Sequence, residues 1–226
     1  MAKKDSFVNM VVTLFVITAI PAVLLGFVYK FTKEPIEQAK KIKLSNSIDL
    51  VVPGASTAEI NQFSVMPETG KDSLTFYEVV SENKIIGTAV QTYSDNAFGG
   101  RITIMVGFKP DGTIIDNDVL EHSETPGLGD KASKSKSDWN SQFKDKNPKE
   151  FNINLKKDGG EVDAITAATI SSRAYIDALQ RAYDAFIKYY TNSSDIEESL
   201  TIEEIDEQIE QKTELETNDT EKGGVE

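Results

Sequence analysis

The sequence predicts an α+β protein, with one transmembrane helix at the N-terminus followed by a domain in which helices pack on an antiparallel sheet. Residues 7–29 carry no charge and are mostly apolar. Four runs with strand composition lie between residues 74 and 120, joined by short polar connections, which favours antiparallel pairing. Residues 170–190 repeat apolar side chains at spacings of three and four, as an amphipathic helix does.

The N-terminal run is long enough to cross a bilayer. At the helical rise, residues 7–29 span roughly 34 Å, against a hydrocarbon core of about 30 Å. A secretory signal has a shorter apolar region, of about 7–15 residues, and a cleavage site of small residues. Residues 26–30 make a poor site of that kind. We therefore expect a retained anchor in the lipid bilayer. Lysines flank it on both sides, and the large domain that follows leaves its orientation open.

Composition excludes several kinds of site. With no cysteine and one histidine, the chain cannot build a disulfide framework, an iron–sulfur cluster, a cysteine zinc site or a bis-histidine haem. Redox chemistry would therefore need an organic cofactor. The net charge of −13 argues against nucleic acid as a partner.

Most of that charge lies at the C-terminus. Residues 191–226 hold 13 acidic residues and two lysines, a charge of 2 − 13 = −11. The sequence thus divides into an anchor (1–30), a domain (31–190) and an acidic tail (191–226) that we expect to be flexible.

The elements of the domain are predicted from local patterns. A helix should begin at Glu34-Pro35, since proline is tolerated in a first turn, and end at the Val-Val-Pro-Gly of residues 51–54. Residues 61–73 have loop composition. The polar residues Ser81-Glu82-Asn83 are expected to form the turn between the first two strands, and Asp111-Gly112 between two β-rich runs predicts a hairpin. The expected strands are 74–80, 84–93, 101–108, 113–120 and a short last one at 161–165. Short and long helices are expected at 138–143 and 170–190.

Residues 162–175 form the first candidate site. A short apolar strand end leads into small and hydroxyl residues and then into the long helix. A helix start presents unpaired N–H groups and a positive dipole end, which suit an anion such as phosphate. Ala167 and Ala168 let a ligand come close. The hydroxyl side chains are those of Thr166, Thr169, Ser171 and Ser172. Hydroxyls at a helix start also act as ordinary caps, and the residues alone leave both interpretations open.

Residues 121–131 form the second candidate site. Thr125-Pro126-Gly127 favours a tight turn, and the glycines let the backbone approach a ligand. The Gly-x-Gly here lacks the third glycine and the βα context of a dinucleotide site. Glu124 can accept hydrogen bonds from ring N–H groups, and Leu128 can cover an apolar face. His122, the single histidine, suits either a structural hydrogen bond or a base.

Together, the two motifs resemble the FMN-binding subunits of two related respiratory complexes. These are the G subunit of the Rnf complex and the C subunit of the sodium-translocating NADH:quinone oxidoreductase. The resemblance rests on the anchor, on Glu-Thr-Pro-Gly-Leu-Gly at 124–129 and on Asp-Ala-Ile-Thr-Ala-Ala-Thr at 163–169. The Gly-Gly-Arg-Ile of residues 99–102 and Asp111-Gly112 also match, so the likeness extends from the anchor to Tyr190.

The resemblance implies FMN bound covalently, through a phosphoester on Thr169. It implies that the isoalloxazine is lined by Glu124, Thr125 and Leu128, with Thr166 near the phosphate. Ser172 would reach the phosphate or cap the helix, and Asp163 would belong to the motif that a flavin transferase recognises. The implied cofactor-binding set is Thr169, Thr166, Ala168, Glu124, Thr125, Leu128 and Ser172. No catalytic residue and no metal ligand is implied.

The implied function is electron transfer within an ion-translocating ferredoxin:NAD⁺ oxidoreductase (Rnf), by a subunit that is not catalytic alone. Its partners would be the other membrane subunits, and its flavin domain would lie on the outer face of the cytoplasmic membrane. The short connection between anchor and sheet favours Rnf over the quinone oxidoreductase. A third alternative is a tethered scaffold that has lost its flavin. Its support is Ala167, where the family has glycine: a positive φ there would cost about 1 kcal/mol, whereas a requirement for close approach would make alanine a mild change.

Overall fold

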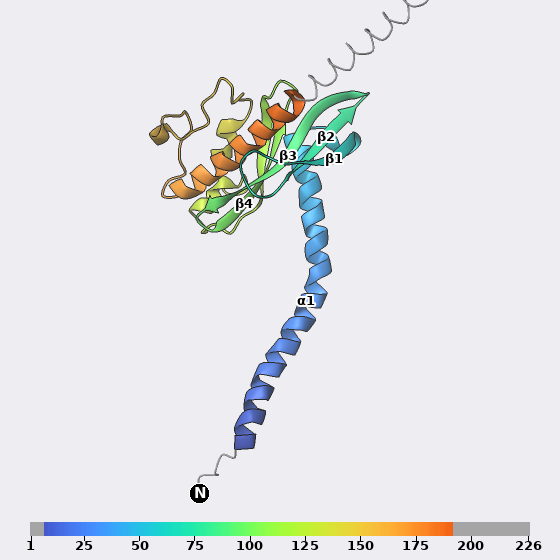
Figure 1. Ribbon diagram of the computed structural model, residues 1–226, viewed down its shortest axis with the longest axis vertical. Helices are drawn as coiled ribbons and strands as arrows, with labels where there is room; N and C mark the ends of the chain where they lie inside the picture. Colours follow the sequence, from blue (N-terminus) through green and yellow to red (C-terminus); the bar gives the residue numbers. More distant parts are fainter. Residues whose placement is uncertain (1–6, 192–226) are drawn as a thin grey trace, which may run out of the picture. The chain divides into compact units, whose positions relative to one another are not determined.

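A computed structural model describes residues 7–191 of the chain (Figure 1). The predicted acidic tail, apart from its first residue, lies outside these residues. The chain forms two compact units, divided between Ser47 and Ile48. The second unit contains the sheet, both sequence motifs and the long helix that follows them.

The chain begins with one long helix, α1 (Phe7–Val51). It is long and apolar enough to cross a membrane, and the side chains of residues 7–29 are almost all exposed. The prediction of a separate helix starting at Glu34-Pro35 is wrong, because Pro35 lies inside α1, as Pro21 does. A proline removes one backbone hydrogen bond, and the glutamate, glutamine, alanine and lysine residues that follow favour a continued helix. The predicted end is confirmed: α1 stops at Val51, and Gly54 has a φ of 94°.

A five-stranded antiparallel sheet forms the centre of the domain, in the order β1-β2-β3-β4-β5. The strands are β1 (Glu59–Val65), β2 (Leu74–Ser81), β3 (Lys84–Ala97), β4 (Gly100–Phe108) and β5 (Ile114–Glu121). The four predicted strands are confirmed as β2 to β5. The loop predicted over 61–73 is wrong in its first part, which belongs to β1. This edge strand is mostly exposed, so its composition is polar; its pairing with β2 and the packing of Phe63 on Phe76 (ring centroids 5.4 Å apart) hold it in the sheet.

The predicted hairpins have the expected turn residues. Ser81 pairs with Lys84, which leaves Glu82 and Asn83 as a two-residue turn with φ values of 50° and 60°. Two positive φ angles match the twist that such a tight hairpin needs. Between β4 and β5, Gly112 has a φ of 83°, and the N–H of Lys109 donates to the carbonyl of Thr113 at 2.9 Å.

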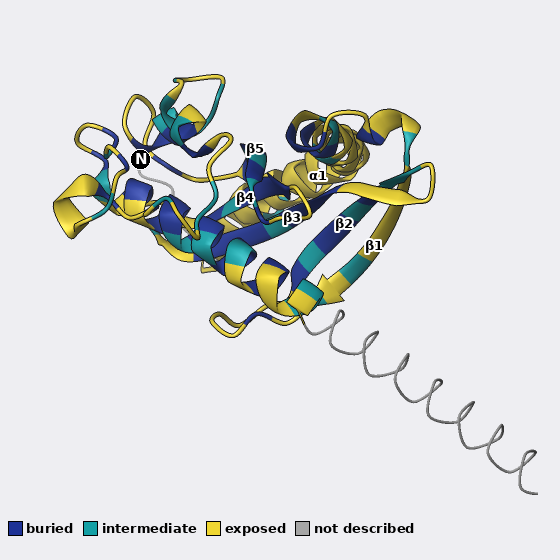
Figure 2. Cartoon of the chain, turned by 90° about the horizontal axis from the view of Figure 1, so that it is seen from above, coloured by how far each residue is buried: buried dark blue, intermediate teal, exposed yellow. Residues whose placement is uncertain are grey.

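The long helix of residues 169–191 packs on one face of this sheet, as predicted for 170–190. Figure 2 shows buried residues along this helix and on the strands beneath it. Phe186 stacks on Phe108 with ring centroids 4.9 Å apart. The Oγ1 of Thr92 on β3 donates to the carbonyl of Ala178 at 2.9 Å. Burial of this apolar face drives the packing of the helix.

An irregular segment, residues 122–168, connects β5 to this helix. It contains three short 3₁₀ helices: η2 (Gly129–Ala132), η3 (Trp139–Phe143) and η4 (Lys156–Asp158). The helix predicted over 138–143 is confirmed as η3. The strand predicted over 161–165 is wrong: Val162 makes only a single bridge to Leu155. Side chains take the place of a partner strand, because Asp163 N–H donates to Gln142 Oε1 (2.8 Å) and Ile165 N–H donates to Ser172 Oγ (2.9 Å).

Candidate functional site

The two sequence motifs meet at a cavity of about 330 Å³. Five of the predicted site residues line it, and two do not. The lining residues are Phe98, Glu124, Thr125, Leu128, Gly129, Ala167, Ala168, Thr169, Ile170 and Ser171. Thr166 and Ser172 are absent from this lining. The cavity therefore joins the β3–β4 connection, the loop after β5 and the start of the 169–191 helix.

The helix start forms one side of the cavity. Its first backbone hydrogen bond runs from Ser172 N–H to the carbonyl of Ala168 at 3.0 Å, which makes Ala168 the N-cap residue. The N–H groups of Thr169, Ile170 and Ser171 precede this bond and have no acceptor within the helix. Alanine has no side-chain oxygen to cap them. The half-buried Thr169 thus stands at an uncapped, positive helix end that borders the cavity.

The turn before the helix brings a left-handed residue next to the cavity. Ala168 N–H donates to the carbonyl of Ile165 at 3.0 Å, and Ala167, inside this turn, has a φ of 61°. The sequence left two interpretations of position 167, a backbone that needs positive φ or a ligand that needs close approach. The structure has the positive φ, which costs alanine about 1 kcal/mol relative to glycine. Thr166, in the same turn, is exposed and takes no part in the cavity wall.

Ser172 is fully buried and holds the turn by two hydrogen bonds. Its Oγ accepts the N–H of Ile165 at 2.9 Å and donates to the carbonyl of Ala168 at 3.0 Å. The hydroxyl therefore acts as donor and as acceptor within the protein. In the described structure, this hydroxyl therefore holds the turn in front of the helix and accepts none of the N–H groups of Thr169, Ile170 and Ser171.

Glu124 is buried and links the three segments around the cavity. Its Oε1 accepts the N–H of Gly99 at 2.9 Å, and its Oε2 accepts the Oγ–H of Ser171 at 2.5 Å. At Gly129, a Cβ would overlap Oε2 of Glu124, so a larger residue would have to displace this hydrogen-bonded carboxylate. A Cβ on Gly99 would overlap the carbonyl oxygen of Ser123. Close contacts rather than turn geometry explain these two glycines.

The loop between Glu124 and Gly129 has the predicted tight turn. Leu128 N–H donates to the carbonyl of Thr125 at 3.1 Å, and Gly127 has a φ of 79°. Leu128 remains 40% exposed at the cavity. His122 has a structural hydrogen bond, since its Nδ1 accepts the N–H of Glu124 at 3.2 Å.

Phe98 lines the cavity but was not predicted. It lies in the connection between β3 and β4, because β3 extends four residues beyond its predicted end at Tyr93. Its side chain is 69% exposed. The signal that the sequence offers is an aromatic residue in front of the Gly99-Gly100 pair.

Asp163 lies outside the cavity lining, at the start of the turn that leads to Thr169. Trp139 Nε1–H donates to its carbonyl at 2.5 Å, and Gln142 accepts its N–H. Its exposed carboxylate pairs with Lys156 at 2.7 Å. In the same region, the Arg173 guanidinium holds the pKa of the Asp158 carboxyl below its usual value, mainly by hydrogen bonding. Within residues 7–191, no group of three or more acidic or histidine side chains is placed to hold a metal ion.

The sequence of this chain is similar to those of known proteins. The family described as FMN-binding domain matches residues 98–184, a range that begins at Phe98 and includes both motifs. The G subunit of the ion-translocating oxidoreductase complex of Erwinia tasmaniensis is 34% identical over 178 residues, covering 75% of this chain and 85% of that protein. The corresponding G subunits of Shewanella piezotolerans (31% identical; 70% and 79% covered) and Escherichia coli K12 (30%; 76% and 86%) are similar too.

Proposed function

Because this chain belongs to the family of G subunits of the ion-translocating oxidoreductase complex, we propose that it is the electron-transfer subunit of such a complex and carries FMN covalently on Thr169. One observation carries the proposal. Thr169 begins a helix whose uncapped N-terminus borders the cavity where the two motifs meet. The protein itself is a membrane protein, with a helix suited to cross the bilayer and relatives in an ion-translocating complex.

The residues around the cavity fit the parts of FMN. The N–H groups of Thr169, Ile170 and Ser171 suit a phosphate, which would replace the cap that Ala168 lacks. Leu128 and Ile170 offer apolar surface for a ring, and Glu124 and Thr125 offer polar groups at its edge. A volume of about 330 Å³ is within the range of about 300–1,000 Å³ typical of small-molecule sites.

Thr169 is suited to the covalent bond by its position. Its half-buried side chain is accessible to a flavin transferase, whereas Ser171 and Ser172 are buried and hydrogen-bonded within the protein. The Oγ of Thr169 would attack the FMN phosphorus of a flavin dinucleotide donor. The new Oγ–P bond would replace a P–O bond of the pyrophosphate, a nucleoside monophosphate would leave, and the hydroxyl proton would pass to the transferase. Asp163 belongs to the motif that this enzyme would recognise.

FMN, when bound, supplies electron transfer in steps of one or two electrons. The protein's part is to hold the ring, to exclude water with Leu128 and Ile170, and to keep Glu124 fixed beside it. Electrons would enter from and leave to other membrane subunits of the complex. The flavin domain would lie on the outer face of the cytoplasmic membrane, where a covalent bond prevents loss of the cofactor. We also propose the division into anchor (1–30), FMN domain (31–190) and tail (191–226).

Two alternatives rest on specific observations. The C subunit of the quinone oxidoreductase shares the two motifs, but the similar proteins described above are named as G subunits of the ion-translocating complex. A flavin-free scaffold would rest on Ala167, yet the cost of its positive φ, about 1 kcal/mol, is small against the stability of a domain.

Coexpression of the full chain with a flavin transferase tests the redox proposal. A band that keeps flavin fluorescence on a denaturing gel supports it, and a colourless protein contradicts it. Subunits that copurify with the chain distinguish the two complexes. To test the orientation, protease is added to cells whose outer envelope has been opened while the cytoplasmic membrane stays intact. A flavin domain that this protease cannot reach would contradict the proposed orientation.

A further inference from the structure

Phe98 is a large apolar side chain that stays 69% exposed at the edge of the cavity. We infer that Phe98 forms the outer wall of the flavin site, with its ring packed on a face of the isoalloxazine, and that Asp177 holds this wall in place through Ser94 and Asn96. The inference rests on the proposed function, because it adds a ring contact and its positioning residues to the same site.

The exposure of Phe98 is informative because its backbone is fixed. Large aromatic side chains are usually well buried in a folded domain. Next to Phe98, however, Gly99 N–H donates to the buried Glu124, and the backbone of Gly99 lies so close to Ser123 that no Cβ would fit. A residue held this firmly cannot simply turn inward. Its ring is therefore available to an apolar ligand in the cavity.

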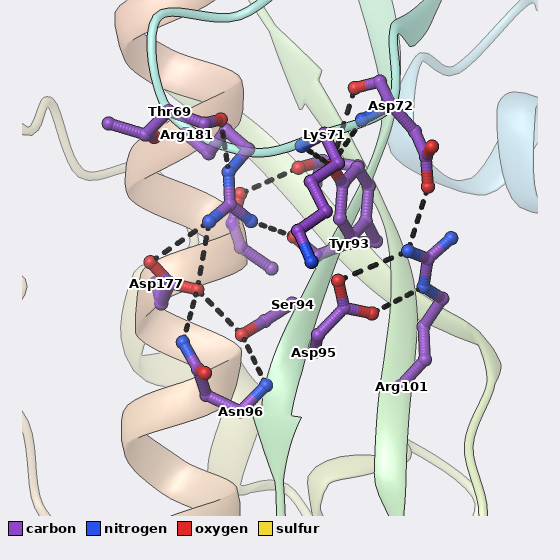
Figure 3. Close-up of polar contacts among 12 residues, drawn as sticks. Thr69, Lys71, Asp72, Tyr93, Ser94, Asp95, Asn96, Arg101, Asp177 and Arg181 are labelled. Carbon is purple, nitrogen blue, oxygen red and sulfur yellow. Dashed lines mark hydrogen bonds and ion pairs between the residues drawn. The ribbon is translucent and has the colours of Figure 1, made fainter.

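A set of hydrogen bonds, which we call the Asp177 latch, ties the connection that carries Phe98 to the long helix (Figure 3). Ser94 Oγ–H donates to Asp177 Oδ2 at 2.6 Å, and Asn96 Nδ2–H donates to the same oxygen at 3.5 Å. Asn96 N–H also donates to Ser94 Oγ at 3.3 Å. The latch sits where the pairing of β3 with β4 is interrupted, between Ser94 and Ala97. It replaces ladder hydrogen bonds that this bulge lacks.

Asp177 is itself held by the buried Arg181, whose Nη2 lies 3.1 Å from Asp177 Oδ2. Arg181 also donates to the carbonyl oxygens of Thr69 and Tyr93, so it cannot swing away freely (Figure 3). On the other side of the connection, Arg101 of β4 pairs with Asp95 of β3 at 2.6 Å. Both ends of the segment that carries Phe98 are thus braced.

The chemistry of the cavity points to a planar heteroaromatic ring as the ligand of Phe98. Leu128 and Ile170, both partly exposed, offer apolar surface elsewhere on the cavity wall. A flat ring between such surfaces leaves only its edge to polar groups such as Glu124. Aromatic rings prefer offset stacking, driven by complementary charge distribution. An oxidised, electron-poor flavin therefore gains more from Phe98 than a reduced one, so the contact should lower the reduction potential and shield the ring from solvent.

The test uses the full chain, coexpressed with a flavin transferase and purified in detergent. Flavin fluorescence, its quenching by iodide and the reduction potential are measured per covalently bound FMN, which mass spectrometry counts. Phe98→Ala should raise fluorescence and iodide quenching at least twofold and shift the potential to more positive values. Phe98→Tyr, which keeps the ring, should keep the iodide accessibility and the reduction potential of the wild type. Asp177→Ala should act in the same direction as Phe98→Ala but less. Ile60→Ala, which removes an exposed apolar side chain from β1, is the matched control and should change nothing.

The outcomes separate this inference from the function on which it rests. A wild type without covalent FMN would overturn both. A flavinylated Phe98→Ala variant with the fluorescence, quenching and potential of the wild type would overturn only the assignment of Phe98. If Phe98→Ala has the expected effect and Asp177→Ala has none, the latch is not a positioning device.

Discussion

Ser171 donates a 2.5 Å hydrogen bond from its Oγ to Oε2 of Glu124, a residue 47 positions earlier in the chain. This bond connects the two motifs that the sequence singles out. Since Oε1 of the same carboxylate accepts the N–H of Gly99, one buried side chain fixes three walls of the cavity. The site is therefore formed by the protein alone, which is the preorganisation that a bound cofactor needs.

The first prediction concerns this carboxylate. Glu124→Ala leaves Gly99 N–H and the Ser171 hydroxyl without their acceptor, and should lower the free energy of unfolding by about 1–3 kcal/mol. Glu124→Gln is the matched variant: its Oε1 can accept from Gly99 while its Nε2 donates to Ser171, so it should lose less than about 1 kcal/mol. Urea unfolding of the full chain in detergent, followed by the fluorescence of Trp139, the single tryptophan, measures both. Equal losses of unfolding free energy in the two variants would contradict the stabilising role of these two hydrogen bonds.

Ser172 provides a second prediction. Ser172→Ala leaves the N–H of Ile165 unpaired in a buried position and should destabilise the domain by about 1–3 kcal/mol. Thr166→Ala, at an exposed position of the same turn, should change stability by less than about 0.5 kcal/mol. The same unfolding measurement compares them. A Ser172→Ala variant as stable as Thr166→Ala would show that Ser172 does not hold this turn.

Ala167 allows a test of the backbone. Because its φ is 61°, Ala167→Gly removes a steric cost of about 1 kcal/mol, partly offset by the greater freedom of glycine in the unfolded chain. We expect a small net gain in stability. Ala167→Val places a β-branched side chain in the left-handed region and should cost more than about 1 kcal/mol. Thermal unfolding of the three proteins should give the order Gly, Ala, Val, and the reverse order would exclude a positive φ at this position.

Stability should also fall at alkaline pH because of Tyr175. Burial raises the pKa of the Tyr175 hydroxyl far above its usual value, and the charges of Asp118 and Asp116 raise it further. The folded state then keeps the proton while the unfolded state loses it above its own pKa of about 10. The contribution of Tyr175 to the free energy of unfolding is fully present below that pH. Above it, this contribution falls by about 1.4 kcal/mol per pH unit.

Tyr175→Phe checks this assignment. The variant should show a flatter decline of unfolding free energy between about pH 10 and 11.5. It should also be less stable at neutral pH, because Asn117 Oδ1 loses the hydrogen bond that Tyr175 donates at 2.5 Å. An unchanged slope would assign the alkaline loss to other groups.

Local patterns predicted most of the fold. The helix at 170–190 and the turns at 81–83 and 111–112 depend on residues that are close together in the chain, so they can be predicted from the sequence directly. The edge strand β1 could not be predicted in this way, because it depends on pairing with β2 and on the contact of Phe63 with Phe76. Likewise, Pro35 favoured a helix start locally, whereas the surrounding helix formers extend α1 through it.

The site was predictable only in part. The meeting of Glu124 with the start of the long helix followed from a family resemblance rather than from spacing. The role of Ser172 in holding the turn before the helix needed coordinates, because it depends on where Ile165 and Ala168 lie. Phe98 was missed because its contact with the cavity is purely tertiary. The sequence raised the question whether φ is positive at Ala167, but only the structure answers it.

The most direct test of the central claim is peptide mass spectrometry of the full chain after coexpression with a flavin transferase. We predict that the mass of FMN, joined as a phosphoester, lies on Thr169. It should disappear in Thr169→Ala and persist in Thr169→Ser, which keeps a hydroxyl at the helix start, and in Thr166→Ala. FMN on Thr166, or a Thr169→Ala protein that still carries the adduct, would contradict the account.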